Sequence, residues 1–219
     1  MIRFFDIILS LLAIIVLTPF MIPIMIGLKI TGEHHVFFKQ IRIGKNGKPF
    51  YLFKFATMLE NSINMQGGSH TLKDDPRILP MGRFLRRTKI NELPQLVNIL
   101  KGDMSVIGYR PVGEVGYSFW PEKVKEELKN SKPGLSGIGS IVFRNEEEIL
   151  QTVDDKDAYY RKNMLPYKME LECWYQKKKN IFMYWQMIFL TLDAVIGKQK
   201  WKRTLKDLPE IPEELKGYI

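Results

Sequence analysis

The sequence predicts an α/β fold that is rich in helix and has a membrane element at its N-terminus. Residues 7–28 contain no charged side chain, whereas charged and polar residues are spread through the rest of the chain. Short runs of β-favouring aromatic residues follow, and apolar residues at helical spacing recur further on. We therefore expect a small β-hairpin or sheet and several helices packed at the membrane surface.

The apolar segment is long enough to enter a bilayer. At ~1.5 Å rise per residue, residues 7–28 would form a helix of about 33 Å, against a hydrocarbon core of about 30 Å. A signal peptide fits poorly, because the run exceeds an h-region and no small-x-small cleavage site follows. Thr18-Pro19 lies at its midpoint and Pro23 follows one turn later, so the helix should bend or break there. Two courses stay open: a kinked spanning helix, or a helix-break-helix that returns to the same face.

The charge balance favours an anionic partner. There are 33 Lys and Arg residues against 24 Asp and Glu, a net charge of +9, which suits phospholipid headgroups, a nucleotide or nucleic acid. No recognisable nucleic-acid motif occurs, so we expect no nucleic-acid partner. Basic residues without an intervening acid follow the apolar run and place the body of the protein on the cytoplasmic side. They are Lys39, Arg42, Lys45, Lys48 and Lys54.

Several local elements can be predicted after the membrane segment. Residues 36–55 indicate a β-hairpin that turns at Gly44–Lys48. Asn61–Lys73, rich in Asn, Gly and Ser, indicates a loop. Residues 181–196 are strongly apolar with basic flanks, which is typical of an interfacial helix, although a buried core helix would show the same length. The single cysteine, Cys173, excludes an internal disulfide.

Residues 75–111 gather cations around one acid. Asp75-Pro76-Arg77 is followed by a basic run at residues 83–89 and then by Asn91-Glu92. Arginine forks match phosphate oxygens, and carboxylates suit hard metals. The pattern therefore indicates a site for a diphosphate together with a divalent cation.

Residues 92–100 predict a helix with Asn91 as its N-cap. Apolar residues recur there at helical spacing, and Gly102 is a suitable stop. Glu92 would then stand at the positive end of the helix dipole, beside N–H groups that favour phosphate. Simple capping with a favourable first-turn acid explains Asn91 and Glu92 equally well. For the arginines at 83, 86 and 87, a solvated or lipid-facing basic surface is the competing explanation.

Taken together, the motifs resemble those of the bacterial sugar transferase family, the small monotopic phosphoglycosyl transferases. The resemblance extends over most of the chain and keeps the family's order of motifs. Its specific parts are Phe5-Asp6-Ile7, Thr18-Pro19 where the family has Ser-Pro, Phe38-Lys39-Gln40 with Arg42 and Gly44, Lys54-Phe55 with Thr57-Met58, Asp75-Pro76-Arg77, Gly82–Arg86, Glu92–Leu96, Gly102–Ser105, Arg110-Pro111 and Lys132–Gly137.

The resemblance implies a fold and a reaction. Residues 1–33 would form a re-entrant membrane hairpin of helix-break-helix type, and residues 34–219 a cytoplasmic, membrane-associated catalytic domain. The reaction would transfer a sugar 1-phosphate from a UDP-sugar to polyprenyl (undecaprenyl) phosphate and release UMP, with Mg²⁺ as cofactor. It would be the first membrane step of exopolysaccharide, lipopolysaccharide or other glycoconjugate assembly, at the cytoplasmic face of the bacterial inner membrane. Further partners would be membrane lipids, a second copy in a homodimer, or downstream glycosyltransferases.

The resemblance also assigns the site. In the family an Asp-Glu pair does the chemistry: the Asp attacks the sugar-linked phosphorus and the Glu helps to bind the metal. Glu92 matches the Glu, and Asn91 occupies the Asp position. Cations would bind the substrate phosphates, and these are Lys54, Arg77, Arg86, Arg110 and Arg144. The chain departs from the family pattern at Ala56, at Tyr109 and in residues 138–148.

Asn91 leaves four mechanisms open, because an amide oxygen is not ordinarily an activated nucleophile. Polyprenyl phosphate would attack directly, with positioning and electrostatics lowering the barrier. Alternatively, Glu92 or Asp103 would replace the missing nucleophile. The residue would otherwise mark an engineered Asp-to-Asn variant, or a natural, catalytically silent homologue that acts as a carrier-lipid-binding scaffold. The cluster of cations favours the enzyme.

Overall fold

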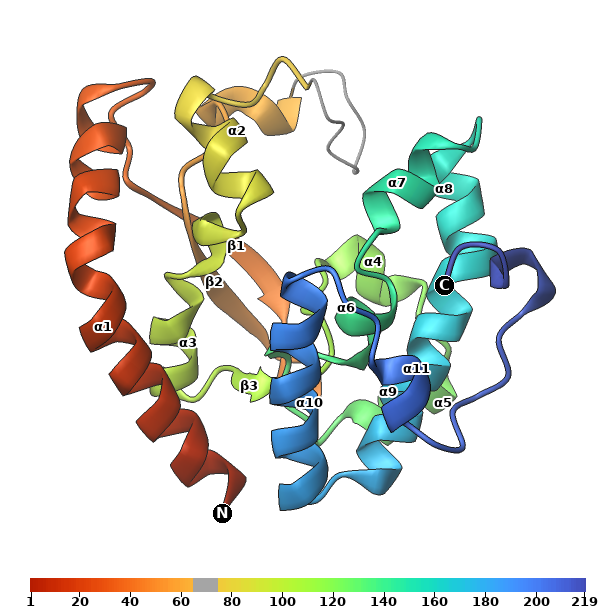
Figure 1. Cartoon of the computed structure of the whole chain (residues 1–219). Helices are drawn as coiled ribbons and strands as arrows, with labels where there is room; N and C mark the ends of the chain where they lie inside the picture. The colour runs from red at the N-terminus through yellow and green to blue at the C-terminus, as the bar shows by residue number, and fades with distance from the viewer. Residues whose placement is uncertain (65–74) are drawn as a thin grey trace. The chain divides into compact units, whose positions relative to one another are not determined.

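A computed structural model describes residues 1–64 and 75–219 of the chain (Figure 1). It divides into two compact units, which we call the N-terminal and C-terminal units. The N-terminal unit contains Arg3–Arg42 and Pro49–Asp103, and the C-terminal unit contains Met1–Ile2, Ile43–Lys48 and Met104–Ile219. This division rests on packing. The predicted division at residue 33, between membrane hairpin and catalytic domain, stays a prediction.

The N-terminal element is one long helix, α1, from Ile2 to Ile30, drawn as a single coiled ribbon in Figure 1. The predicted helix-break-helix is therefore wrong at the level of secondary structure: Pro19 and Pro23 lie inside the helix. Each proline removes only one donor, and the hydroxyl of Thr18 donates to the carbonyl of Ile14 at 2.6 Å, so the surrounding turns persist. Among the described helices, α1 is the one long and apolar enough to cross a membrane.

Both ends of α1 are fixed within the N-terminal unit. At its start, the guanidinium of Arg3 donates to the carbonyls of Ile99 and Leu100, the latter at 2.7 Å. This satisfies carbonyls at the end of a helix and complements its dipole. At its other end, Leu28 is 2% exposed and packs with Phe55 and Leu85. Many large apolar side chains between these ends are exposed, as expected for a helix whose solvent is lipid.

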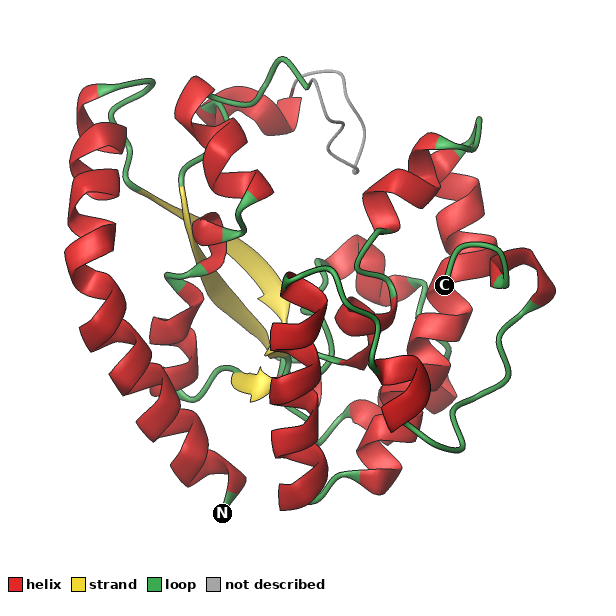
Figure 2. Ribbon diagram, viewed as in Figure 1, coloured by secondary structure: helices red, strands yellow, loops and turns green. Residues whose placement is uncertain are grey.

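The predicted β-hairpin is confirmed. Strands β1, Phe37–Ile43, and β2, Pro49–Phe55, pair in a two-stranded sheet, the long yellow ribbons of Figure 2. The turn between them contains a short 3-10 helix, η1, Lys45–Gly47, with Asn46 in the left-handed region at φ 59°. This turn belongs to the C-terminal unit.

Short helices complete the N-terminal unit. They are η2, Glu60–Asn64; α2, Pro80–Arg87; η3, Ile90–Glu92; and α3, Gln95–Lys101. Part of the predicted loop at Asn61–Lys73 therefore belongs to a 3-10 helix, and its remainder, from residue 65 on, lies outside the described residues. Asn98 of α3 links this helix to β2, because its side chain accepts from the Phe53 amide and donates to the Tyr51 carbonyl.

The C-terminal unit is mostly helical. Strands β3, Ser105–Ile107, and β4, Gly134–Ser136, pair in parallel, with Ser105 opposite Gly134. A Cβ on Gly134 would lie 2.1 Å from the Gly108 nitrogen, so these two backbones meet where only glycine fits. The remaining elements are α4, Glu114–Ser118; α5, Glu122–Leu128; α6, Ile138–Val142; α7, Glu146–Gln151; α8, Lys156–Tyr159; the π-helical η4, Tyr160–Met164; α9, Leu165–Lys178; α10, Ile181–Val195; α11, Trp201–Thr204; and η5, Glu213–Leu215.

A buried cluster between α5 and α9 includes Tyr109, Trp120 and Cys173. The rings of Tyr109 and Trp120 meet edge to face, with centroids 5.4 Å apart. Tyr109, one of the departures from the family pattern, is therefore a packing residue here. Cys173 is 8% exposed, and burial raises the pKa of its thiol to about 12.

Helix α10 has two apolar faces with different surroundings. Tyr184, Met187 and Leu190 are buried within the unit, whereas Phe182 and Phe189 are 74% and 65% exposed. The helix is shorter than a membrane span. The explanation as a core helix is therefore confirmed for one face, and the interfacial role of the other face stays a prediction.

Candidate active site

The chain around Asn91 and Glu92 is a 3-10 turn, not the first turn of the predicted helix. Lys89 takes a left-handed conformation at φ 60°, and the amide of Glu92 donates to the Lys89 carbonyl. Pro94 lacks an N–H and cannot make the i→i−4 bond that would extend an α-helix back through Ile90. Pro94 therefore caps α3, and the prediction of Asn91 as its N-cap is wrong. Glu92 lies in η3, before α3 begins. The prediction that Glu92 stands in the first turn of that helix, at the positive end of its dipole, is therefore wrong.

Asn91 has an unsatisfied side chain. It is 6% exposed, and its Oδ1 atom has no hydrogen-bond partner within residues 1–64 and 75–219. Leaving a buried carbonyl oxygen unpaired costs roughly 1–3 kcal/mol. A bound group or an ordered water can supply the partner of such an atom.

This oxygen and the carboxylate of Glu92, the next residue in the chain, are both hard oxygen donors of the kind that Mg²⁺ binds. Magnesium prefers hard oxygen ligands and is usually held by one or two protein groups, with substrate phosphates and water completing its shell. The described residues contain no cluster of three or more His, Cys, Asp or Glu side chains suited to a metal. Magnesium as a cofactor stays a prediction.

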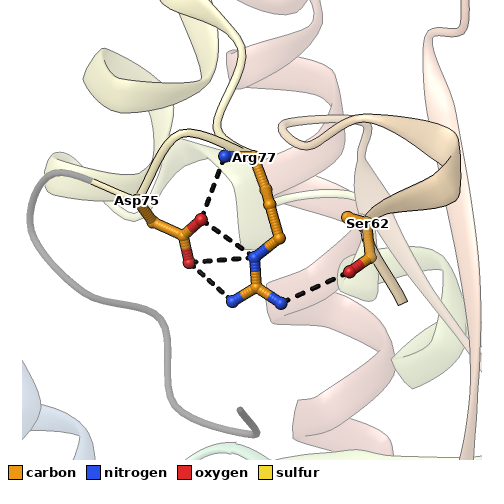
Figure 3. Close-up of polar contacts among 3 residues, drawn as sticks. All are labelled: Ser62, Asp75 and Arg77. Atoms are coloured by element: carbon orange, nitrogen blue, oxygen red, sulfur yellow. Dashed lines mark hydrogen bonds and ion pairs between the residues drawn. The ribbon is translucent and has the colours of Figure 1, made fainter. Parts of the chain in front are cut away.

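Asp75 and Arg77 form a buried ion pair (Figure 3). The Nη2 of Arg77 lies 2.6 Å from Oδ2 of Asp75, and its Nε lies 2.9 Å from Oδ1. The Arg77 amide donates to the same carboxylate, and Nη1 donates to the Ser62 carbonyl at 3.3 Å. The Arg77 guanidinium holds the pKa of Asp75 below its usual value, and the charge of Arg86 on α2 acts in the same direction. Arg77 thus joins two segments of the N-terminal unit, and its role as a phosphate ligand stays a prediction.

The seven predicted site residues are divided between the two units. The N-terminal unit contains five of them: Lys54 on β2, Arg77, Arg86 on α2, and Asn91 and Glu92 in η3. Lys54, Arg86 and Glu92 are half-buried. The C-terminal unit contains Arg110, just after β3, and Arg144, between α6 and α7, and both are exposed.

Sequence reasoning missed a buried carboxylate, Glu172, and a half-buried lysine, Lys168, on α9. Lys168 forms an ion pair with Glu146, and Oε1 of Glu172 accepts from the Gly139 amide at 3.1 Å. Burial raises the pKa of Glu172 to about 7 and lowers the pKa of Lys168, which the Arg110 charge lowers further. The sequence did contain a signal for this pair. Lys168 and Glu172 are four residues apart and alternate with the apolar residues Tyr167, Met169 and Leu171, so both charges lie among core residues and need polar partners.

The sequence pattern of one family, described as bacterial sugar transferase, matches residues 1–198. The chain belongs to this family. The exopolysaccharide production protein PSS of Rhizobium leguminosarum bv. phaseoli is 40% identical over 144 residues, which are 64% of this chain and 72% of that protein. The resemblance stated from the motifs is therefore confirmed, and the chain is a sugar transferase.

Two longer relatives have more specific names. The UDP-glucose:undecaprenyl-phosphate glucose-1-phosphate transferase of Xanthomonas campestris pv. campestris is 31% identical over 197 residues, 89% of this chain and 38% of that protein. The undecaprenyl-phosphate galactose phosphotransferase of Salmonella typhimurium (strain LT2) is 34% identical over 175 residues, 74% of this chain and 36% of that protein. The chain thus spans less than half the length of these two relatives.

Proposed function

We propose that the chain transfers a sugar 1-phosphate from a UDP-sugar to polyprenyl phosphate and releases UMP, as the first membrane step of polysaccharide or glycoconjugate assembly. The single observation that carries the proposal is the unpaired, buried oxygen of Asn91, whose neighbour in the sequence is the carboxylate-bearing Glu92. In a sugar transferase, this pair of oxygens suits a metal-bound diphosphate. The names of the Xanthomonas and Salmonella relatives support the same reaction.

Glu92 and Asn91 would hold the magnesium ion, which supplies charge neutralisation of the diphosphate when bound. Lys54 and Arg86 of the same unit would bind phosphate oxygens as charge builds up on them, and the phosphate-binding roles of Arg110 and Arg144 stay predictions. Arg77, already paired with Asp75, would contribute by holding its segment in place.

The reaction that best suits Asn91 is direct transfer. An oxygen of polyprenyl phosphate attacks the sugar-linked phosphorus of the donor, and a new P–O bond forms. The bond from that phosphorus to the bridging oxygen breaks, and UMP leaves with this oxygen and its electron pair. Asn91 cannot supply a nucleophilic anion, so it positions the diphosphate through its amide. Asp103 is a poor substitute nucleophile, because Lys101 lies 3.4 Å from it and the Asn98 amide donates to it.

A second candidate function follows from the same residue. With Asn91 at the family's Asp position, the chain would be a catalytically silent homologue or an engineered Asp-to-Asn variant. It would then bind the carrier lipid as a scaffold and transfer nothing. An active transferase and a silent scaffold would share this fold, so a measurement of activity is needed to distinguish them.

The test is UMP release by the full chain in lipid nanodiscs with polyprenyl phosphate, Mg²⁺ and a panel of UDP-sugars. We expect release by the wild type, a loss of 100-fold or more in Glu92→Ala, and little change in the exposed control Lys206→Ala. Absence of release by the wild type, together with release by Asn91→Asp, would establish the silent homologue instead. Intact-mass spectrometry then separates the mechanisms, because direct transfer leaves no phosphosugar adduct on the protein.

The proposal includes a location and partners. The long apolar helix α1 associates the chain with a membrane, and the basic residues that follow α1 favour the cytoplasmic face of the bacterial inner membrane. Donor and carrier lipid are the substrates, and membrane lipids surround α1. A second copy of the chain, or a downstream glycosyltransferase that takes up the product, would be a further partner.

A further inference from the structure

Asn98 on α3 is a fully buried polar residue that lies against one edge of β2. It is 0% exposed. The Ala56 amide donates to the Val36 carbonyl, and in an antiparallel hairpin every second residue continues such pairing. The backbone groups of Tyr51 and Phe53 therefore point to the opposite edge of β2, away from β1. That edge is the one that Asn98 meets.

The side chain of Asn98 takes the place of a third strand at this edge. Its Oδ1 accepts from the Phe53 amide at 3.0 Å, and its Nδ2 donates to the Tyr51 carbonyl at 2.7 Å. The same Nδ2 donates to Oδ2 of Asp103 at 3.2 Å. A side-chain carboxamide offers the donor and the acceptor of a peptide group, so it reproduces a strand contact that no apolar side chain can make.

The position of Asn98 on α3 is itself fixed by its backbone. Its carbonyl accepts from the amides of Gly102 and Asp103, at 3.1 and 3.0 Å. These bonds close the C-terminal end of α3, where Gly102 takes the left-handed conformation at φ 95°. Asn98 thus joins β2, α3 and the segment after α3 through hydrogen bonds of defined direction, whereas apolar packing would allow these elements to slide.

The elements that Asn98 joins carry parts of the candidate site. Lys54 on β2 is the residue after Phe53, and Asn91 and Glu92 lie in η3, shortly before α3. Strand β2 also packs against η3. All these elements belong to the N-terminal unit. A shift of β2 along α3 would therefore move Lys54 relative to Asn91 and Glu92.

We propose that Asn98 is a positioning residue, which sets the place of Lys54 relative to Asn91 and Glu92. Groups that stabilise a transition state act only when their supports hold them to within about 0.5 Å, and a displacement of about 1 Å can cost on the order of 100-fold in rate. Asn98 is buried and acts through Lys54. The inference rests on the proposed function, in which Lys54 binds phosphate oxygens.

The experiment is a double-mutant cycle on UMP release by the full chain in nanodiscs, with Asn98→Ala, Lys54→Ala and the double variant. We expect Asn98→Ala to lower kcat by about tenfold or more, with the donor KM within about threefold of wild type. In the Lys54→Ala background the same change should cost less than about threefold, because the group that Asn98 positions is gone. A merely structural role would lower activity by the same factor in both backgrounds.

Asn180→Ala is the matched control. The Asn180 amide also accepts from a backbone N–H, that of Met183 at 2.9 Å, and donates to a backbone carbonyl, that of Lys178 at 3.1 Å. Asn180 belongs to the C-terminal unit and is not a residue of the candidate site, so its loss should leave kcat within twofold of wild type. Differential scanning fluorimetry sets the assay temperature below the melting temperature of every variant. If Asn98→Ala does not fold, Asn98→Asp replaces it, because it keeps the shape and the acceptor for the Phe53 amide.

Two results would overturn the inference while leaving the proposed function in place. The first is a kcat of the folded Asn98 variant within twofold of wild type. The second is an equal loss in the wild-type and Lys54→Ala backgrounds. If UMP is released only by Asn91→Asp, the proposed function fails, and the same cycle in that background decides the inference. If no UMP is released in either background, both fail.

Discussion

Each unit of the molecule buries a carboxylate, and the two carboxylates behave in opposite ways. Asp75 in the N-terminal unit is 4% exposed and faces the guanidinium of Arg77, which lowers its pKa. Glu172 in the C-terminal unit is 8% exposed and accepts from a neutral amide, and burial raises its pKa to about 7. Similar burial therefore yields a stable anion in one unit and an acid that titrates near neutral pH in the other. The partner, not the burial, decides the charge.

The largest expected effect comes from breaking the charged pair. Asp75→Ala leaves a buried guanidinium without its counter-ion, and the melting temperature should fall by roughly 5–10 °C. Differential scanning fluorimetry in detergent would measure this. Because the pKa of Asp75 is lowered, its contribution is present above pH 3.8 and is lost as the pH falls through the folded-state pKa.

Asp207→Ala is the control for this prediction. Asp207 also has a cationic partner, Lys178 at 3.0 Å, but its side chain is 83% exposed. An equal fall in melting temperature in Asp75→Ala and Asp207→Ala would show that burial does not make the Asp75–Arg77 pair more stabilising than an exposed pair.

The next effect is a pH dependence that belongs to Glu172. Its pKa rises from 4.5 unfolded to about 7 folded, so between these values the folded state binds more protons. The stability it contributes is therefore complete below pH 4.5 and falls by on the order of 3 kcal/mol as the pH rises to 7. Glu172→Gln keeps an acceptor for Gly139 and should flatten this part of the pH profile.

Chemical denaturation at pH 4.5, 5.5, 6.5 and 7.5 would measure the profile. Glu170→Gln, exposed on the same helix, should leave the wild-type slope in place. Lys168 and Lys179 both act to lower the pKa of Glu172. A profile that is already flat in the wild type would mean that these cations keep Glu172 charged, as Arg77 keeps Asp75.

A smaller effect compares backbone packing in the two units. A Cβ on Gly82 would lie 2.2 Å from the Thr57 carbonyl oxygen, and one on Gly134 would lie 2.1 Å from the Gly108 nitrogen. Gly82→Ala and Gly134→Ala should each lower the free energy of unfolding by about 1–3 kcal/mol. Gly217→Ala, with no atom near its Cβ, should be close to neutral. If one of the two variants keeps the wild-type free energy of unfolding, the backbone at that glycine is packed less tightly than at the other.

The smallest effect should come from an exposed ion pair. Lys129 lies 2.9 Å from Glu126 on the same surface, and the two side chains are 49% and 70% exposed. Lys129→Ala should change the free energy of unfolding by less than about 1 kcal/mol, because solvent and salt screen such pairs. Urea denaturation at low and high salt would test this, and a change comparable with that of Asp75→Ala would contradict it.

The elements that the sequence predicted correctly are those with a strong local signal. The hairpin of β1 and β2 follows from aromatic strands around a Gly-Lys-Asn-Gly turn, and the long apolar helix follows from residues without charge. The predictions that failed are those in which the effect of a proline on a helix was overestimated or underestimated. Two prolines in α1 did not interrupt the helix, whereas Pro94 moved the start of α3 and left Asn91 outside it.

The candidate site was only partly predictable, because burial and contacts between residues far apart in the sequence decide most of its properties. Asn91 and Glu92 could be named from their motif, but the unpaired state of the Asn91 oxygen is a property of burial. Glu172 meets an amide 33 residues earlier in the chain, and no local pattern reports such a contact. A pocket near Arg144 likewise combines residues from α7, α10 and the end of the chain.

The protonated, buried thiol of Cys173 has a practical consequence. Thiol-directed reagents need a thiolate, so maleimides at neutral pH should leave the native chain unmodified. A cysteine introduced near either end of α1 would then carry the only label in the protein. Membrane-impermeant and permeant maleimides applied to inverted and right-side-out vesicles would assign each end to one face of the bilayer, and thereby distinguish a crossing helix from one that enters and returns.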